Sequence, residues 1–262
     1  MHQLCIDTAK FAPDIFLFQE PNMDFHKQDL LEKVDQIFKD HFHQAKLIVS
    51  NLIQSTDSTW QPGGTAIVVT GKWTTAILER YQDPMGRFTS ITLNISKAPS
   101  LTIYSVYNCC KNEIAKAGTN TAYAQQWKAL WLQGKENADV QREMVEALNK
   151  QVQINKKKKH HILIMGDMNE ELGKDPNLMS KVCVQNNMFD VHTARLQQEA
   201  EIPTYNRGQN RIDYSLLSLE LINKVKACGF NLFNEYFVSD HRAQFVDIAV
   251  KAPLEKIVQH EL

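Results

Sequence analysis

The sequence has no long apolar run, no excess of charge of one sign and no cysteine pair with metal-ligand spacing. None of its apolar stretches approaches the roughly 18 residues that a membrane-spanning helix needs. The 29 Lys and Arg residues nearly balance the 30 Asp and Glu residues, so the formal net charge is −1. A polyanionic partner would therefore have to be met by a local basic surface.

The cysteine pattern favours free thiols. The five cysteines are odd in number, and none of them form a C-x-x-C pair, so we expect a reducing compartment. Residues 1–14 lack the apolar core of a signal peptide. We expect an intracellular protein without a membrane partner, with the nucleus as one candidate compartment.

Apolar periodicity predicts helices and strands over most of the chain. Continuous apolar or β-branched runs predict strands that are covered on both faces, and apolar residues at helical spacing predict helices. The predicted strands are 14–20, 65–70, 88–95, 101–108, 161–165, 211–218 and 243–250. The predicted helices are the first twelve residues, 27–41, 122–132, 138–154 and 176–187.

This mixture of buried strands and helices indicates a layered α/β protein. With 43% hydrophobic residues, the chain has a globular composition and enough length to bury a sizeable core. We find no internal repeat and no linker, so we expect residues 1–262 to form a single domain.

Polar side chains stand at the ends of four predicted strands, where apolar residues would be expected. Residues two apart in an extended chain point to the same face, so Asp167 and Asn169 converge if the strand continues past Gly166. Burying a carboxylate without a partner is unfavourable, and a hard cation such as Mg²⁺ is one possible partner. The other polar strand ends are Glu20, Asp213, Asp240 and His241.

Each of these short patterns has an ordinary structural explanation when it is taken alone. GDMN is a turn in most proteins, RIDY fits a salt bridge at a strand start, and SDH fits a helix cap or a turn. Their order along the chain, however, favours a functional explanation over these structural ones. The segments DIFLFQE, GGTAIVV, MGRFTSITL, SVYN, ILIMGDMNE, RIDYSLLS and VSDHRAQF resemble, in order, the motifs of the endonuclease/exonuclease/phosphatase superfamily.

The resemblance runs from about Asp14 to Val250 and implies a DNase I-like fold. That fold is an α/β four-layer sandwich, with two β-sheets face to face and helices outside. Members open with a strand that bears a metal-positioning Asn, and no Asn in a strand-like context precedes Glu20. We therefore expect an N-terminally truncated domain whose first strand is missing, either because the chain is a fragment or because the strand has been lost.

The resemblance also implies a site that uses a divalent metal, Mg²⁺ or Mn²⁺. Glu20 matches the principal metal ligand, and Asp240 matches a second position near the metal. The implied catalytic residues follow the same order of motifs. Asp167 would align or deprotonate the attacking water, Asn169 would help to hold the phosphate, and His241 would contact the scissile phosphate with its ring oriented by Asp213.

Tyr107 helps to place the chain within the superfamily. The matching position is usually His in DNase I-like and sphingomyelinase members, and usually Tyr in abasic-site and retrotransposon endonucleases. The segment before GDMN is also similar to retroelement endonuclease domains. The alternative is that Tyr107 is an ordinary strand tyrosine.

Arginines and tryptophans are the remaining candidates for contact with a substrate. Arginines in turns near the motif strands could bind phosphate, and tryptophans could stack on bases, although core packing is the default for at least two of them. The arginines are Arg87, Arg207 and Arg211, and the tryptophans are Trp60, Trp73, Trp127 and Trp131.

Three functions remain open from the sequence. The leading prediction is a Mg²⁺-dependent phosphodiesterase that acts as an endonuclease on nucleic acid, with DNA favoured over RNA. The second is a catalytically inactive remnant, which the absent first strand motivates. The third is a hydrolase of a small phosphate ester or a phospholipid headgroup. The oligomeric state is not predicted.

Overall fold

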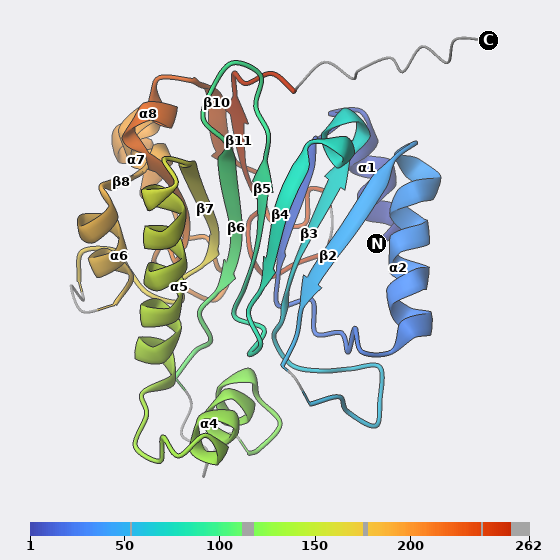
Figure 1. The fold of residues 1–262 in the computed structure, drawn as a ribbon, viewed down its shortest axis with the longest axis vertical. Helices are drawn as coiled ribbons and strands as arrows, with labels where there is room; N and C mark the ends of the chain where they lie inside the picture. The colour runs from blue at the N-terminus through green and yellow to red at the C-terminus, as the bar shows by residue number, and fades with distance from the viewer. Residues whose placement is uncertain (53, 112–117, 175–177, 237, 253–262) are drawn as a thin grey trace.

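Two stacked layers of β-strands form the centre of the computed structural model, and helices cover their outer faces (Figure 1). The structure describes residues 1–252 except 53, 112–117, 175–177 and 237. The four-layer α/β arrangement confirms the predicted fold class. Among the helices of this described part, none has the length and hydropathy that crossing a bilayer requires.

The larger layer is a six-stranded sheet. Its strands are β4 (Ile77–Gln82), β5 (Phe88–Leu93), β6 (Leu101–Tyr107), β7 (His161–Asp167), β8 (Met188–Asp190) and β9 (Asp213–Ser218). They lie in the order β4-β5-β6-β7-β9-β8. Neighbours are antiparallel except β6 and β7, which run parallel because a long helical crossover connects them. The parallel pair places the carboxyl ends of β6 and β7 at the same edge of the sheet.

The facing layer consists of a three-stranded antiparallel sheet and a separate pair of strands. Its strands are β1 (Ile15–Gln19), β2 (Ala45–Ser50), β3 (Thr65–Thr70), β10 (Val225–Phe230) and β11 (Gln244–Ile248). The sheet has the order β1-β3-β2, and β10 pairs with β11. Within the described ranges, β1 pairs with β3 alone, β11 pairs with β10 alone, and no strand precedes β1.

Helices cover both outer faces of the stacked layers. They are α1 (His2–Ala9), α2 (Gln28–His41), α4 (Ala122–Leu132), α5 (Val140–Lys157), α6 (Met179–Asn186), α7 (Val191–Leu196) and α8 (Leu219–Ile222), with 3₁₀ helices η1 (Gly71–Thr75) and η2 (Gln197–Ala200). One face of α2 buries Val34, Ile37 and Phe38 against β1 and β3. The side chain of Asp139 caps α5, whose apolar face packs with α6 on the six-stranded sheet.

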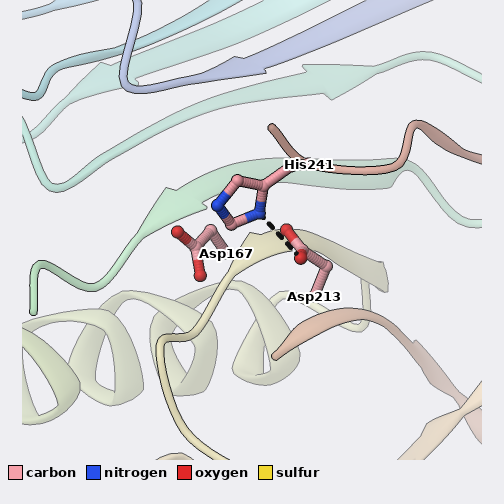
Figure 2. A group of neighbouring side chains, drawn as sticks. All are labelled: Asp167, Asp213 and His241. Carbon is pink, nitrogen blue, oxygen red and sulfur yellow. Dashed lines mark hydrogen bonds and ion pairs between the residues drawn. The ribbon is translucent and has the colours of Figure 1, made fainter. Parts of the chain in front are cut away.

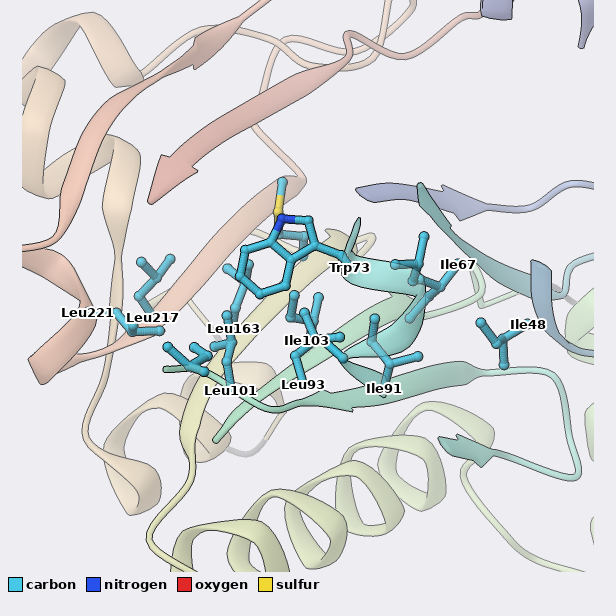
Figure 3. Packing of buried hydrophobic residues seen from close by; sticks show 14 of the residues in the cluster. Ile48, Ile67, Trp73, Ile91, Leu93, Leu101, Ile103, Leu163, Leu217 and Leu221 are labelled. Atoms are coloured by element: carbon cyan, nitrogen blue, oxygen red, sulfur yellow. The ribbon is translucent and has the colours of Figure 1, made fainter. Parts of the chain in front are cut away.

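The apolar core between the two layers is built from strands of both. Figure 3 shows Ile67 of β3 and the ring of Trp73 above Ile91, Ile103 and Leu163 of the six-stranded sheet. Each fully buried side chain of this size contributes about 1.5–3 kcal/mol relative to exposure. Trp73 is 4% exposed, which assigns this tryptophan to the core.

Polar side chains also join the two layers inside the core. Nε2 of Gln19, on β1, donates to Oγ of Ser105, on β6, at 2.8 Å. Oγ of Ser215, on β9, donates to Oε1 of Gln244, on β11, at 2.7 Å. A buried polar group without a partner costs about 1–3 kcal/mol, so these pairs favour one alignment of the layers.

Most predicted elements are confirmed within a few residues of their predicted bounds. The strand predicted at 211–218 begins at Asp213, and the helix predicted at 176–187 begins at Met179; residues 176 and 177 lie outside the described residues. The sequence patterns do not predict β2, β4, β8 and β10.

Candidate functional site

Three polar side chains lie side by side where three central strands of the six-stranded sheet end or begin. Strand β6 ends at Tyr107 and strand β7 ends at Asp167, and these two residues are paired in the parallel ladder. On the other side, Asp167 is paired with Asp213, the first residue of the antiparallel strand β9. Strand register therefore brings together residues that lie 60 and 46 positions apart in the chain (107, 167 and 213).

His241 joins this row from the facing layer, just before β11. Its Nδ1 lies 3.0 Å from Oδ2 of Asp213 (Figure 2). One ligand atom each of Asp167, Asp213 and His241 lie within 4.8 Å of one another. The carboxylate of Asp213 therefore fixes the imidazole beside Asp167, as the sequence resemblance implies for this pair.

Asn169 orients the carboxylate of Asp167. Its backbone N–H donates to Oδ1 of Asp167 at 2.9 Å, and its Nδ2 donates to Oδ2 at 2.9 Å. The φ of Asn169 is 48°, a left-handed conformation that asparagine tolerates better than most residues. Nδ2 also donates to the carbonyl of Asn108, and Oδ1 accepts from Sγ of Cys110 at 2.8 Å. The carboxamide is thus held by contacts within the protein.

Glu20 and Asp240 surround the same cluster from the facing layer. Burial raises the pKa of Glu20, while a hydrogen bond from Tyr107 and the charge of His241 lower it and the charge of Asp240 raises it. These four side chains therefore lie within electrostatic range of one another. The structure thus brings together all seven residues of the predicted catalytic and metal set: Glu20, Tyr107, Asp167, Asn169, Asp213, Asp240 and His241.

Burial and neighbouring charges shift the protonation of the central groups. Burial raises the pKa of Asp167, and the negative charge of Asp213 raises it further. Burial alone would lower the pKa of His241, but the hydrogen bond and charge of Asp213, with the charges of Asp167 and Asp240, raise it to about 9. Burial also raises the pKa of Tyr107 far above its usual range. Near neutral pH the imidazole is positively charged and the phenol is neutral.

We expect the metal-free protein to lose stability between pH 6.5 and pH 9. The folded-state pKa of His241, about 9, lies above its ordinary value of 6.5, so this stabilisation is complete below pH 6.5 and is lost as the pH rises through 9. The raised pKa of Asp167 acts in the same direction. Urea unfolding in EDTA should show a loss on the order of 2 kcal/mol. An equal loss in a variant that carries both His241→Gln and Asp167→Asn would contradict this assignment.

The predicted arginines occupy different environments. Arg87 is buried, and its Nε and Nη2 donate to the carboxylate of Asp83 at 2.8 and 2.7 Å. Arg211 is buried beside Asp190 and over the ring of Tyr214, on the face of β9 opposite to Asp213. Neither is brought into the cluster by these contacts.

Arg207 lies closer to the cluster along the chain. It is exposed and follows Asn206, whose backbone N–H donates to the carbonyl of Asp240 at 2.8 Å. Of the three arginines, Arg207 is therefore the one in an exposed segment tied to the site.

Three residues that support the site are absent from the sequence prediction. Tyr205 forms a backbone bridge with His241, and its ring centroid lies 5.1 Å from that of the imidazole. Oγ1 of Thr204 accepts from the backbone N–H of Ile212 and of Asp213, which fixes the start of β9. Cys110 is the third, through Asn169. Of these three, only Cys110 lies next to a motif in the sequence, since it follows Tyr107 by three positions.

The donor set suits a hard divalent cation. Nδ1 of His241 already contacts Asp213, so the carboxylates of Glu20, Asp167 and Asp240 supply the oxygens that remain for an ion. Carboxylate oxygens select hard ions over soft ones. A cation would also relieve the repulsion that raises the pKa of Asp167 beside Asp213.

Several solved structures share the fold. The AP endonuclease LMAP from Leishmania major superposes with a TM-score of 0.60 at 13% identity, covering 93% of this chain and 80% of that one. The 3′ phosphatase NExo from Neisseria, bound to a product DNA hairpin, gives 0.59 at 16% identity, covering 94% and 93%. The endonuclease domain of TRAS1, a telomere-specific non-LTR retrotransposon, gives 0.56 at 14% identity, covering 94% and 90%.

At these identities the similarity shows a common fold. No curated protein matches the sequence. The family model described as the Endonuclease/Exonuclease/phosphatase family matches residues 4–241, which is nearly the whole chain. Together with the four-layer fold and the cluster of carboxylates around one histidine, this match shows that the chain belongs to the endonuclease/exonuclease/phosphatase family.

Proposed function

We propose that the protein hydrolyses phosphodiester bonds of nucleic acid with Mg²⁺ or Mn²⁺, and that it acts as an endonuclease. The observation that carries this proposal is the convergence of Glu20, Asp167 and His241, from three distant segments, around one point. Hydrolysis of a phosphodiester needs an aligned water, a positive group that stabilises the negative charge of the phosphate oxygens, and a hydrogen-bond donor for the leaving oxygen. The cluster offers a group for each of these tasks.

Asp167 aligns the attacking water and accepts its proton. Two hydrogen bonds from Asn169 fix the carboxylate before substrate binds, so little reorganisation is needed. Burial raises the pKa of Asp167, which makes it a stronger base than an exposed carboxylate. Because Nδ2 of Asn169 is already bonded to Asp167 and Asn108, we assign Asn169 the task of holding Asp167.

His241 and Tyr107 face the phosphate as hydrogen-bond donors. The charged imidazole, held by Asp213, contacts a non-bridging oxygen, and the neutral phenol of Tyr107 donates a hydrogen bond to the leaving oxygen, which takes up its proton from solvent. A divalent cation, held by Glu20 with Asp240 nearby, would supply further stabilisation of negative charge on the phosphate. These residues explain hydrolysis without any covalent step on the protein.

DNA is the substrate that the comparisons favour. One similar structure is named an AP endonuclease, and another is bound to a product DNA hairpin. Tyr107 stands where the sequence resemblance places tyrosine in abasic-site and retrotransposon endonucleases. These observations support a DNA endonuclease over a lipid or inositol phosphatase.

We expect the protein to nick supercoiled plasmid DNA with Mg²⁺ and to stop when EDTA is added. Conversion of supercoiled to relaxed plasmid on an agarose gel measures the reaction, and plasmids with and without abasic sites separate those two substrates. A chain that cleaves phosphoinositides or sphingomyelin ahead of DNA would contradict the nuclease assignment. If the plasmid, RNA and all phosphate esters stay intact with either metal, the chain is a catalytically inactive member of the family.

A further inference from the structure

A cavity of about 360 Å³ lies between helix α4 and residues 52 and 54–56. Trp127 forms part of its wall, whereas Trp73 is buried in the core and Trp60 and Trp131 are 42% and 46% exposed. The four tryptophans that could stack on bases are therefore in three different environments. Only Trp127, among these four, lines this cavity in the described part of the chain.

The cavity is adjacent to the catalytic cluster. Ala122, at the start of α4, lies in one apolar cluster with Tyr107 and Leu52, and Trp127 packs against the same cluster. A methyl group built on Gly63 would meet both Ala122 and the ring of Tyr107, so the three lie together. Figure 1 shows α4 beyond the end of β6, the strand that ends at Tyr107. The cavity therefore lies beside the residue that we place against the phosphate.

The lining of the cavity has the chemistry of a nucleobase site. Trp127 is half-buried and offers an aromatic face, and the amides of Gln54 and Gln125 offer both donors and acceptors. The hydroxyls of Ser55 and Thr56 donate to partners within the protein, among them Asp24, so they offer only acceptor oxygens to a base, and Lys128 places a positive charge at the rim. Stacking on an aromatic ring is tolerant of sequence, because every base has a π-face.

The charge of the lining also favours nucleic acid. None of the residues that the structure describes in this wall is acidic. A second cavity, of about 490 Å³ beside β8 and β9, is lined by the acidic residues Glu171, Asp190 and Glu201 and by one cation, Arg211, which pairs with Asp190. Its excess of carboxylates would repel a polyanion. The two cavities differ in charge, and the one without carboxylates is the one next to Tyr107.

We propose that the cavity beside α4 binds one unstacked base of the substrate strand, with Trp127 as its stacking platform. This inference rests on the proposed action on nucleic acid and adds a substrate class to it. The protein binds strands that present an unpaired base next to the cleaved phosphodiester, as in single-stranded, gapped or looped DNA. Fully paired DNA cannot fill the cavity without extruding a base, which requires unstacking and unpairing.

Binding can be tested without turnover, by fluorescence anisotropy of a labelled single-stranded oligonucleotide in EDTA. We expect Trp127→Leu, which keeps an apolar side chain but cannot stack, to raise the Kd about 10-fold. Trp127→Phe should restore most of the affinity. Trp131→Leu on the same helix should bind as the wild type does, because its side chain does not line the cavity. Thermal unfolding checks that all three variants fold.

The preference for unpaired bases supplies the second readout. Wild-type protein should bind the single strand more tightly than the matching duplex, and Trp127→Leu should remove most of that difference. Equal weakening of single strand and duplex, or no effect of Trp127→Leu, would overturn the proposal, as would the absence of any binding. Selective weakening in a protein that never cleaves DNA would keep the base site and reject only the nuclease function.

Discussion

Asp167→Asn should reduce the rate of plasmid nicking by about 10²–10⁴-fold and leave the fold intact. The change removes the base that is placed to accept the proton of the attacking water. A carboxamide at position 167 still accepts the backbone N–H of Asn169, so the turn after β7 keeps one of its two local hydrogen bonds. Nicking rates with saturating Mg²⁺ measure the effect.

The stability of the same variant tests whether the ionised carboxylate of Asp167 destabilises the folded protein. Burial and the charge of Asp213 raise the pKa of Asp167, which means that its ionised form is unfavourable in the folded protein. Replacing it with neutral Asn should therefore leave the melting temperature unchanged or raise it. Asp247→Asn, on the exposed part of β11, is the matched control and should nick DNA normally. A large drop in melting temperature for Asp167→Asn would make this residue structural instead.

Gly166→Ala should destabilise the folded protein by about 3 kcal/mol or more. Gly166 sits within β7, between its ladder partners Val106 on β6 and Tyr214 on β9. A methyl group at this position would overlap the backbone carbonyl of Val106, which cannot rotate away as a side chain could. The two strands would have to separate exactly where Tyr107 and Asp167 end them, so the site would be lost as well.

Urea unfolding measures this effect, and Gly71→Ala provides the comparison. A methyl group on Gly71 meets no atom within 4 Å, although its φ of 56° makes alanine there unfavourable by about 1–2 kcal/mol. Gly166→Ala therefore reports steric overlap, and Gly71→Ala reports backbone strain without overlap. If Gly166→Ala unfolds at the same urea concentration as Gly71→Ala, strands β6 and β7 can move apart more easily than their packing indicates.

The central strands were all predictable from sequence, and the strands that were missed are all edge strands, although the edge strands β1 and β11 were predicted. β3, β5, β6 and β7 are covered on both faces, so their sequences are continuous apolar or β-branched runs. The four strands without a prediction, β2, β4, β8 and β10, all lie at sheet edges. They are short or carry polar residues on an exposed side, as in ILERYQ of β4, and such patterns resemble loops.

The site divides in a similar way. The i, i+2 spacing of Asp167 and Asn169 is visible in the sequence, because extended geometry links spacing to direction. The contact between Cys110 and Asn169 spans 59 positions and joins two irregular segments. No helical or strand periodicity in the sequence therefore predicts it. Arg87 and Arg211 look like phosphate ligands in sequence, but their carboxylate partners, Asp83 and Asp190, are visible only in the folded chain. Local rules specify strand ends; tertiary contacts specify what each polar group faces.

The hydrogen bonds from Gln19 to Ser105 and from Ser215 to Gln244 cross the seam between the two layers. Glu20 and His241 stand on one side of that seam, and Tyr107, Asp167 and Asp213 stand on the other. If a phosphate binds residues of both layers, as the proposed function requires, it would hold the two layers together. Separation of the two layers would pull the site residues apart, although the strands within each layer would stay paired. A ligand that binds the site should therefore slow the exchange of backbone amides in both layers together.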